Sequence, residues 1–184
     1  MQTNNLDVAH KVISLFKTSL DKLNKSDFNG SDEECNLAIS LLAKQNEILG
    51  KGPIPLYVAL RIGIPNVNVL SLPDIITGLY YIKGMLNIHS ARYLEAREYF
   101  AAASEFAYRR LLLKANPIDT SEVYFWLAIF HEALSARMSG DVQGLLYARS
   151  LIFTYKNTSF IQVNKSLLAG YSNLSKRIEK ELTL

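Results

Sequence analysis

Apolar residues recur three or four positions apart along almost the whole chain, and this spacing restricts the fold more than any other feature. It is the spacing of one face of an α-helix. It predicts helices over about 5–24, 31–49, 74–89, 93–115, 123–138, 142–156 and 159–183. The alternation typical of a strand occurs only weakly, at 54–62. We therefore expect an all-α protein with about six to seven main helices.

Helix start and stop signals agree with these boundaries. Ser31 and Glu34 have the spacing of a capping box, and Asp119 with Glu122 offers another. Gly140-Asp141 reads as a stop followed by an N-cap, and Ser159 is the expected cap of the last helix. Between Val123 and Met138 only His131, Glu132 and Arg137 carry acidic or basic groups, so this helix should lie centrally in the fold.

One segment interrupts the helical pattern. Four of the five prolines, Pro53, Pro55, Pro65 and Pro73, fall between residues 52 and 73, and no long helix can pass through them. The segment is also rich in Leu, Val and Ile, so we expect an irregular connection packed onto the rest. The predicted organisation is a single domain, 1–184. It comprises an N-terminal helical hairpin (5–49), the Pro/Gly-rich apolar connection (50–73), two further hairpins (74–156) and a C-terminal amphipathic helix (159–183).

Composition excludes several classes of protein. With 49% hydrophobic and 20% charged residues the chain is not intrinsically disordered. No apolar run reaches the roughly 18 residues of a membrane span, and the amino terminus does not read as a signal peptide. A single cysteine agrees with a reducing compartment, so we expect a cytoplasmic location. The net charge of +3 comes from dispersed basic residues, which does not favour nucleic-acid binding.

No pattern of catalytic residues is found. The sequence has no glycine-rich phosphate loop and no nucleophile elbow. His131-Glu132 would need a histidine where Ser135 stands to form a zinc site, and the three histidines lack ligand spacing. Cys35 follows three carboxylates, so we expect a structural cysteine. The sequence therefore predicts no enzyme activity, no metal and no cofactor.

The stretch from Tyr80 to Ala103 resembles a tetratricopeptide repeat. That family has a large and a small residue four apart on its first helix, then a small, an aromatic and a small residue on its second. Here these are Tyr80, Gly84, Ala96, Phe100 and Ala103. The resemblance implies stacked antiparallel helical hairpins, in which small residues let the paired helices approach closely.

A second hairpin around Gly140-Asp141 is similar but departs from the pattern. Leu145, Arg149 and Ile152 stand where small, aromatic and small residues belong. Residues 5–49 show none of the motif, and the two turns are 49 residues apart where the family has about 34. We therefore expect a stack with enlarged helices and not a regular array.

The resemblance also implies a binding face, because the first helix of each such hairpin lines the inner side of the stack. The family pattern places Gly78 there with seven expected partner-binding residues: Tyr81, Met85, Ile88, Leu127, Phe130, Leu134 and Arg137. They would form an apolar groove with one cation at its end, suited to a protein or peptide partner. The groove could instead be filled by residues 51–72 or by the last helix.

The sequence thus favours a non-enzymatic protein–protein interaction module, such as an adaptor, chaperone or regulator. Two alternatives stay open. One is an all-α regulatory domain that holds an apolar small molecule among Tyr80, Tyr81, Phe125, Trp126 and Phe130. The other is a self-assembling helical subunit, so a homo-oligomer is possible.

Overall fold

The computed structural model describes residues 2–48, 72–112, 120–158, 161–162 and 164–183. In these residues the chain forms helices and no strand, which confirms the all-α prediction. The helices are α1 (Gln2–Asn24), α2 (Phe28–Ile48), α4 (Leu72–His89), α5 (Tyr93–Leu112), α6 (Thr120–Met138), α7 (Val142–Tyr155) and α9 (Lys165–Leu182). The predicted Pro/Gly-rich connection lies outside the described residues, except that Leu72 and Pro73 already belong to α4.

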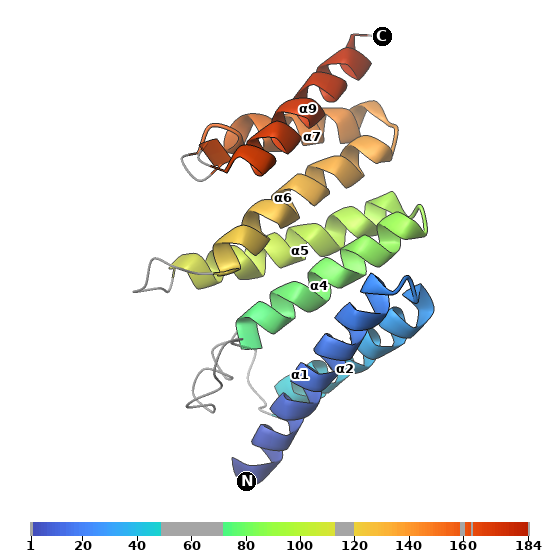
Figure 1. The fold of residues 1–184 in the computed structure, drawn as a ribbon, viewed down its shortest axis with the longest axis vertical. Helices are drawn as coiled ribbons and strands as arrows, with labels where there is room; N and C mark the ends of the chain where they lie inside the picture. Colours follow the sequence, from blue (N-terminus) through green and yellow to red (C-terminus); the bar gives the residue numbers. More distant parts are fainter. Residues whose placement is uncertain (1, 49–71, 113–119, 159–160, 163, 184) are drawn as a thin grey trace.

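The helices stack in adjacent pairs. α1 packs on α2, α4 on α5 and α6 on α7, and α9 covers the last pair by packing on α7 and α6. Figure 1 shows these elements following one another along the long axis of the molecule, with the two termini at opposite ends. α1 also contacts α4, α4 contacts α6 and α6 contacts α9. These four helices, which we call the inner row, therefore run as one continuous layer through the stack.

The turn between α1 and α2 differs from the predicted capping box. α2 begins at Phe28, and the carboxylate of Asp27 accepts a hydrogen bond of 3.0 Å from the Gly30 N–H at this helix start. Ser31 is fully buried and donates to the Ser19 carbonyl across the hairpin at 2.9 Å. Ser31 therefore holds α1 against α2 from inside the helix, and it is not the cap.

The α4–α5 hairpin brings together the residues that the sequence singled out. A Cβ atom on Gly84 would lie 2.6 Å from Cε1 of Phe100, so only glycine leaves room for this ring. Ala96, Phe100 and Ala103 are all fully buried. Ala91 closes the turn with a positive φ of 54°. The small residues and the aromatic of this hairpin are thus used in helix packing.

The α6–α7 hairpin follows the predicted stop and cap. Gly140 has φ 77°, which glycine adopts without strain, and the Asp141 carboxylate accepts from the Gly144 N–H at 2.6 Å. A Cβ on Gly144 would lie 2.3 Å from the carbonyl oxygen of Ala136, so α7 crosses α6 at its glycine. Arg149 does not occupy an aromatic position in the core, because it points outward and pairs with Glu179 of α9.

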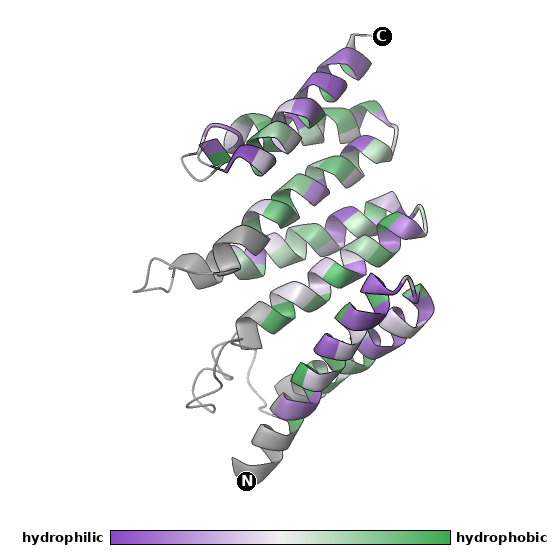
Figure 2. Cartoon of the chain, viewed as in Figure 1, coloured by the Kyte–Doolittle hydropathy of each residue, from purple (hydrophilic) through white to green (hydrophobic). Residues whose placement is uncertain are grey.

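The C-terminal helix begins later than predicted. Asn164 is the N-cap of α9, since its side-chain oxygen accepts from the Leu167 N–H at 3.2 Å, whereas Ser159, the expected cap, lies outside the described residues. Tyr171, Leu174 and Ile178 are buried in one stripe of α9. Figure 2 shows α9 mostly hydrophilic outside that stripe, whereas α6 is largely hydrophobic.

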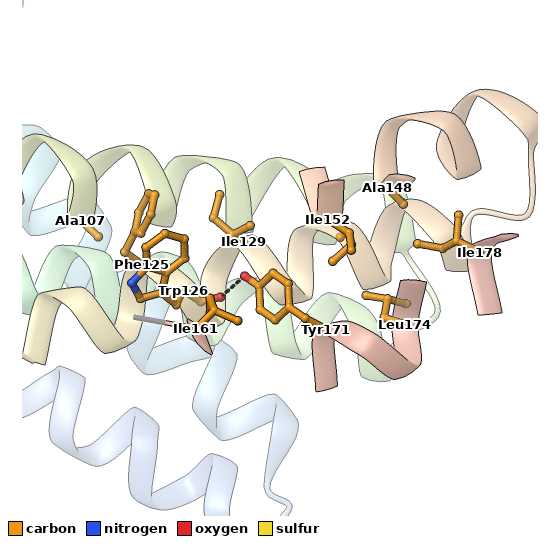
Figure 3. Close-up of a cluster of buried hydrophobic side chains, with 12 residues drawn as sticks. Ala107, Phe125, Trp126, Ile129, Ala148, Ile152, Ile161, Tyr171, Leu174 and Ile178 are labelled. Atoms are coloured by element: carbon orange, nitrogen blue, oxygen red, sulfur yellow. Dashed lines mark hydrogen bonds between the residues drawn. The ribbon is translucent and has the colours of Figure 1, made fainter. Parts of the chain in front are cut away.

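The buried side chains form two clusters. The first joins α1, α2 and α4 through mainly aliphatic residues such as Val12, Ile75 and Leu79. The second joins α5, α6, α7 and α9 and contains aromatic and small residues, among them Trp126, Ala148 and Tyr171. Figure 3 shows this second cluster, where the Tyr171 hydroxyl donates to the Trp126 carbonyl at 2.9 Å.

Candidate partner-binding face

The seven predicted partner-binding residues lie on α4 and α6, two neighbouring helices of the inner row. All seven side chains are half-buried, so none is fully enclosed in the core and none projects freely. We call the surface that they form the α4–α6 face; it consists of Tyr81, Met85, Ile88, Leu127, Phe130, Leu134 and Arg137. Gly78, the eighth position of the pattern, is buried, and a Cβ there would lie 2.6 Å from the Phe16 ring of α1.

Tyr81 and His131 connect the two helices of this face. The Tyr81 hydroxyl lies 3.0 Å from Nδ1 of His131, and the same nitrogen lies 2.9 Å from the Leu127 carbonyl oxygen. The His131 ring also contacts the rings of Phe100 and Phe130, with centroids 5.3 and 5.2 Å away. Burial disfavours the charged imidazolium and lowers the pKa of His131 below its ordinary value. A neutral imidazole therefore fills the junction between α4 and α6.

The C-terminal half of α6 is engaged by α9. The Phe130 ring lies 5.6 Å from that of Tyr171, and a Cβ added to Gly170 would be 3.4 Å from Phe130. Nε of Arg137 donates to the carboxylate of Glu181 at 3.0 Å, and the guanidinium makes a second contact with the same group. The expected cation at the end of the groove is therefore ion-paired with the last helix. α9 covers the Phe130 and Arg137 edge of the face.

Two exposed apolar residues extend the face and were missed by the sequence analysis. Met138 is four residues after Leu134 on α6 and is 36% exposed. Leu20 of α1, 37% exposed, follows Phe16 by one helical turn and so lies on the side of α1 that packs on α4. Helical spacing alone identifies Met138, whereas Leu20 could be placed only once the α1–α4 contact was known.

Lys83 and Asn87 are buried and lie on the side of α4 opposite to the α4–α6 face. Lys83 is 7% exposed, and its ammonium reaches Asp32 of α2 at 2.5 Å and Asn36 at 3.0 Å. Asn87 is buried and donates to the Lys83 carbonyl at 2.8 Å. Lys83 therefore fixes α4 against α2, whereas Asn87 bonds within α4, and neither residue contributes to the α4–α6 face.

The remaining buried ionisable groups are also engaged in packing. Burial raises the pKa of the Cys35 thiol to about 12, and the thiol donates to the Leu79 carbonyl at 3.3 Å. Burial likewise raises the pKa of Glu132, whose carboxylate accepts a hydrogen bond from the Tyr147 hydroxyl. The guanidinium carbon of Arg97 on α5 lies over the Tyr147 ring, 5.3 Å from the ring centroid. Cys35 is thus a structural cysteine. Glu132 of α6, Tyr147 of α7 and Arg97 of α5 together join these three helices.

The five residues proposed for a small-molecule site belong to different parts of the core. Tyr80 packs on the first cluster, where its ring stacks on Phe106 at 5.4 Å. Phe125 and Trp126 are members of the second cluster, and Phe130 packs against it. No group of three or more potential metal ligands occurs in the described part of the chain. The described side chains of the α4–α6 face present apolar surface with polar groups at its edges.

Among the described helices none combines the length and apolar character that crossing a membrane requires. Comparison with models of known protein families, with curated proteins and with solved structures gives no match.

Proposed function

We propose that this protein is a non-enzymatic interaction module, an adaptor, chaperone or regulator, that binds a partner protein or peptide on the α4–α6 face. The observation that carries the proposal is the row of half-buried apolar side chains at Tyr81, Met85, Ile88, Leu127 and Leu134. Tyr81, Met85 and Ile88 are spaced by four and three residues on α4, and Leu127 and Leu134 are seven residues apart on the adjacent α6, which is the spacing that receives an extended peptide or an amphipathic helix. Leaving these half-buried side chains open to solvent costs the fold little free energy. Covering them with a partner is favourable.

The proposal includes a tetratricopeptide-like architecture. The close fit of Phe100 against Gly84 and the buried Ala96 and Ala103 support this likeness in the α4–α5 hairpin. The polar outer side of α9 supports it as well, because repeat stacks require a terminal helix with a polar outer face. The buried, unactivated Cys35 fits a cytoplasmic setting.

A pair of charge substitutions with a matched control tests the proposal. Met85→Glu and Leu127→Glu each place a carboxylate on the face, where it stays hydrated in the free protein but must be desolvated under a partner. Phe153→Glu, at a side chain 74% exposed on α7, is the control. We expect all three variants to keep the wild-type helical circular dichroism. In affinity capture from cells, the first two should lose proteins that the wild type and Phe153→Glu retain. Retention of the same proteins by all variants would contradict the proposal.

One observation favours the self-assembling subunit as a second candidate function. Val142, Leu146 and Phe153 are 63%, 43% and 74% exposed and lie on the outward side of α7. A second copy of the chain that covers this stripe would give twice the mass in solution. Sedimentation of the wild type and of Phe153→Glu decides this alternative, since only a dimer held by α7 would dissociate in the variant.

A further inference from the structure

The charges at the two edges of the α4–α6 face indicate what kind of partner it receives. On α1, Phe16 faces Gly78 of α4, and Lys22 pairs with Glu34 of α2 at 2.8 Å. At 100° per residue these two contacts orient the helix, and they place Lys17 beyond the α4 contact on the side away from α2. Lys17 is exposed, so its ammonium stands at the α1 edge of the face.

The α9 edge carries a second cation. Gly170 approaches Phe130, and Glu181 pairs with Arg137, so these positions mark the side of α9 that faces α6. Arg177 is four residues before Glu181 and seven after Gly170 and therefore lies along the same side. Its side chain is exposed, and it takes part in none of the ion pairs of the described residues.

Carboxylates near the face are already neutralised. Glu181 is paired with Arg137, and Asp21 of α1 is paired with Lys25 at 2.7 Å. Glu132 of α6 is 3% exposed and lies on the opposite side of its helix, against Tyr147. The described side chains thus combine an apolar centre with an unpaired cation at each edge.

We propose that the partner segment is an amphipathic α-helix whose apolar stripe is flanked by Asp and Glu residues. Its apolar stripe covers Met85, Leu127 and Leu134, while its carboxylates lie near Lys17 and Arg177. Complementary charge sets the orientation and raises the rate of encounter, and apolar contact supplies most of the affinity. This inference rests on the proposed function, since it requires the α4–α6 face to be the binding surface.

Two designed peptides test the charge preference. Each is a fluorescein-labelled helix of about 18 residues with leucines at helical spacing, and the flanking positions are all Glu in one peptide and all Lys in the other. We expect anisotropy titrations at low salt to give the Glu peptide a Kd roughly tenfold lower than that of the Lys peptide. The difference should shrink at about 0.5 M salt, where screening shortens the range of these charges.

Matched double variants locate the effect. Lys17→Glu with Arg177→Glu should reverse the preference between the peptides. Lys11→Glu with Lys176→Glu changes the net charge equally, on exposed sites of the same helices that do not border the face, and should leave the preference unchanged. Equal Kd values for the two peptides, or an equal effect of both double variants, would overturn the acidic-partner inference and leave the proposed function standing. Binding of neither peptide would overturn both.

Discussion

The two core clusters of this stack differ in the kinds of side chains that they contain. Around α1, α2 and α4 an aliphatic core is combined with buried polar contacts between helices, namely Ser19 with Ser31 at 3.1 Å and Lys83 with Asp32. Around α6, α7 and α9 the core adds aromatic rings such as Trp126 and Tyr171 to aliphatic side chains, and close approach depends on small residues such as Gly144 and Ala148. In the first region, polar pairs join α1 to α2 and α4 to α2. In the second region, the close packing of rings against small residues is combined with the hydrogen bonds of Tyr171 to the Trp126 carbonyl and of Tyr147 to Glu132.

The α4–α6 face lies where these two regions meet. α4 contributes to the first cluster and α6 to the second, and Tyr81 with His131 connects them. A partner on this face would therefore contact both regions at once. Substitutions that weaken one region without the other show how far the two clusters are independent.

The largest effect is expected in the aromatic cluster. Tyr171→Ala removes a fully buried ring and should lower the free energy of unfolding by about 3–5 kcal/mol. Tyr171→Phe keeps the ring but loses the hydrogen bond to Trp126, and should cost only about 1 kcal/mol. Urea denaturation measures both. Equal losses for the two variants would mean that the hydroxyl, and not the shape of the ring, holds α9 in place.

Gly144 tests close approach in the same region. Gly144→Ala places a Cβ 2.3 Å from the Ala136 carbonyl oxygen, a backbone atom that cannot move aside, and should cost about 3 kcal/mol. Gly170→Ala is the matched control, because its Cβ meets Phe130 at 3.4 Å, close to an ordinary contact distance. Since alanine favours helix, this control should be neutral or should gain up to about 0.5 kcal/mol. A loss of the same size in both would show that α7 does not cross α6 at its glycine.

The polar contacts of the first cluster should respond asymmetrically. Asp32→Ala leaves the ammonium of Lys83, with a side chain 9% exposed, without its carboxylate, and should cost about 2 kcal/mol. Lys83→Met leaves Asp32, whose side chain is 36% exposed and can be hydrated, and should cost less than half as much. Thermal or urea melts of the two variants compare them directly. The reverse order would mean that the pair is hydrated and does not fix α4 on α2.

The smallest expected effect is the pH dependence of stability caused by His131, at the junction of α4 and α6. The pKa of His131 is lowered from 6.5 in the folded protein, so the unfolded chain binds a proton first as pH falls. Stability should therefore decrease as pH drops from about 7 towards the folded-state pKa of His131, and level off below it. The raised pKa of Glu132 acts oppositely, because stability is lost as pH rises from 4.5 through its folded-state pKa.

Subtracting the pH profile of stability of the His131→Phe variant from that of the wild type isolates the contribution of His131. His131→Phe should flatten the decrease below pH 7, whereas His10→Gln, on the exposed surface of α1, should leave the wild-type profile unchanged. Melting temperatures measured across this pH range are sufficient. An unaltered slope in His131→Phe would show that the imidazole is hydrated and does not fill the α4–α6 junction.

Much of this fold could be predicted from the sequence because helical periodicity and capping are local signals. The Gly140-Asp141 turn and the stripe of α9 follow from residues close in the chain, and the Gly84 and Phe100 contact agrees with the resemblance of this hairpin to a tetratricopeptide repeat. The start of α2 was predicted wrongly because Ser31 matches a capping pattern while its hydroxyl is used by Ser19, 12 residues away. The pairing of Arg137 with Glu181 spans 44 residues, and no local pattern indicates it.

The candidate site could be predicted only as a set of positions. Spacing places Tyr81, Met85, Leu127 and Leu134 on matching sides of two helices, and the structure gives all four half-buried side chains on neighbouring helices. Which edge is covered depends on how α9 packs, and that is decided by Gly170 and Tyr171 meeting Phe130. Contacts of this kind depend on the three-dimensional arrangement of elements that are far apart in the sequence.

Site-specific photo-crosslinking tests the central claim most directly. A benzophenone amino acid is introduced at Met85 on the α4–α6 face or, in a second preparation, at Phe153 on α7, and each protein is irradiated in cells. The account predicts that position 85 yields a discrete adduct with another protein and that position 153 does not. Adducts from position 153 alone, or an adduct at twice the 20.7 kDa mass of the chain, would contradict it.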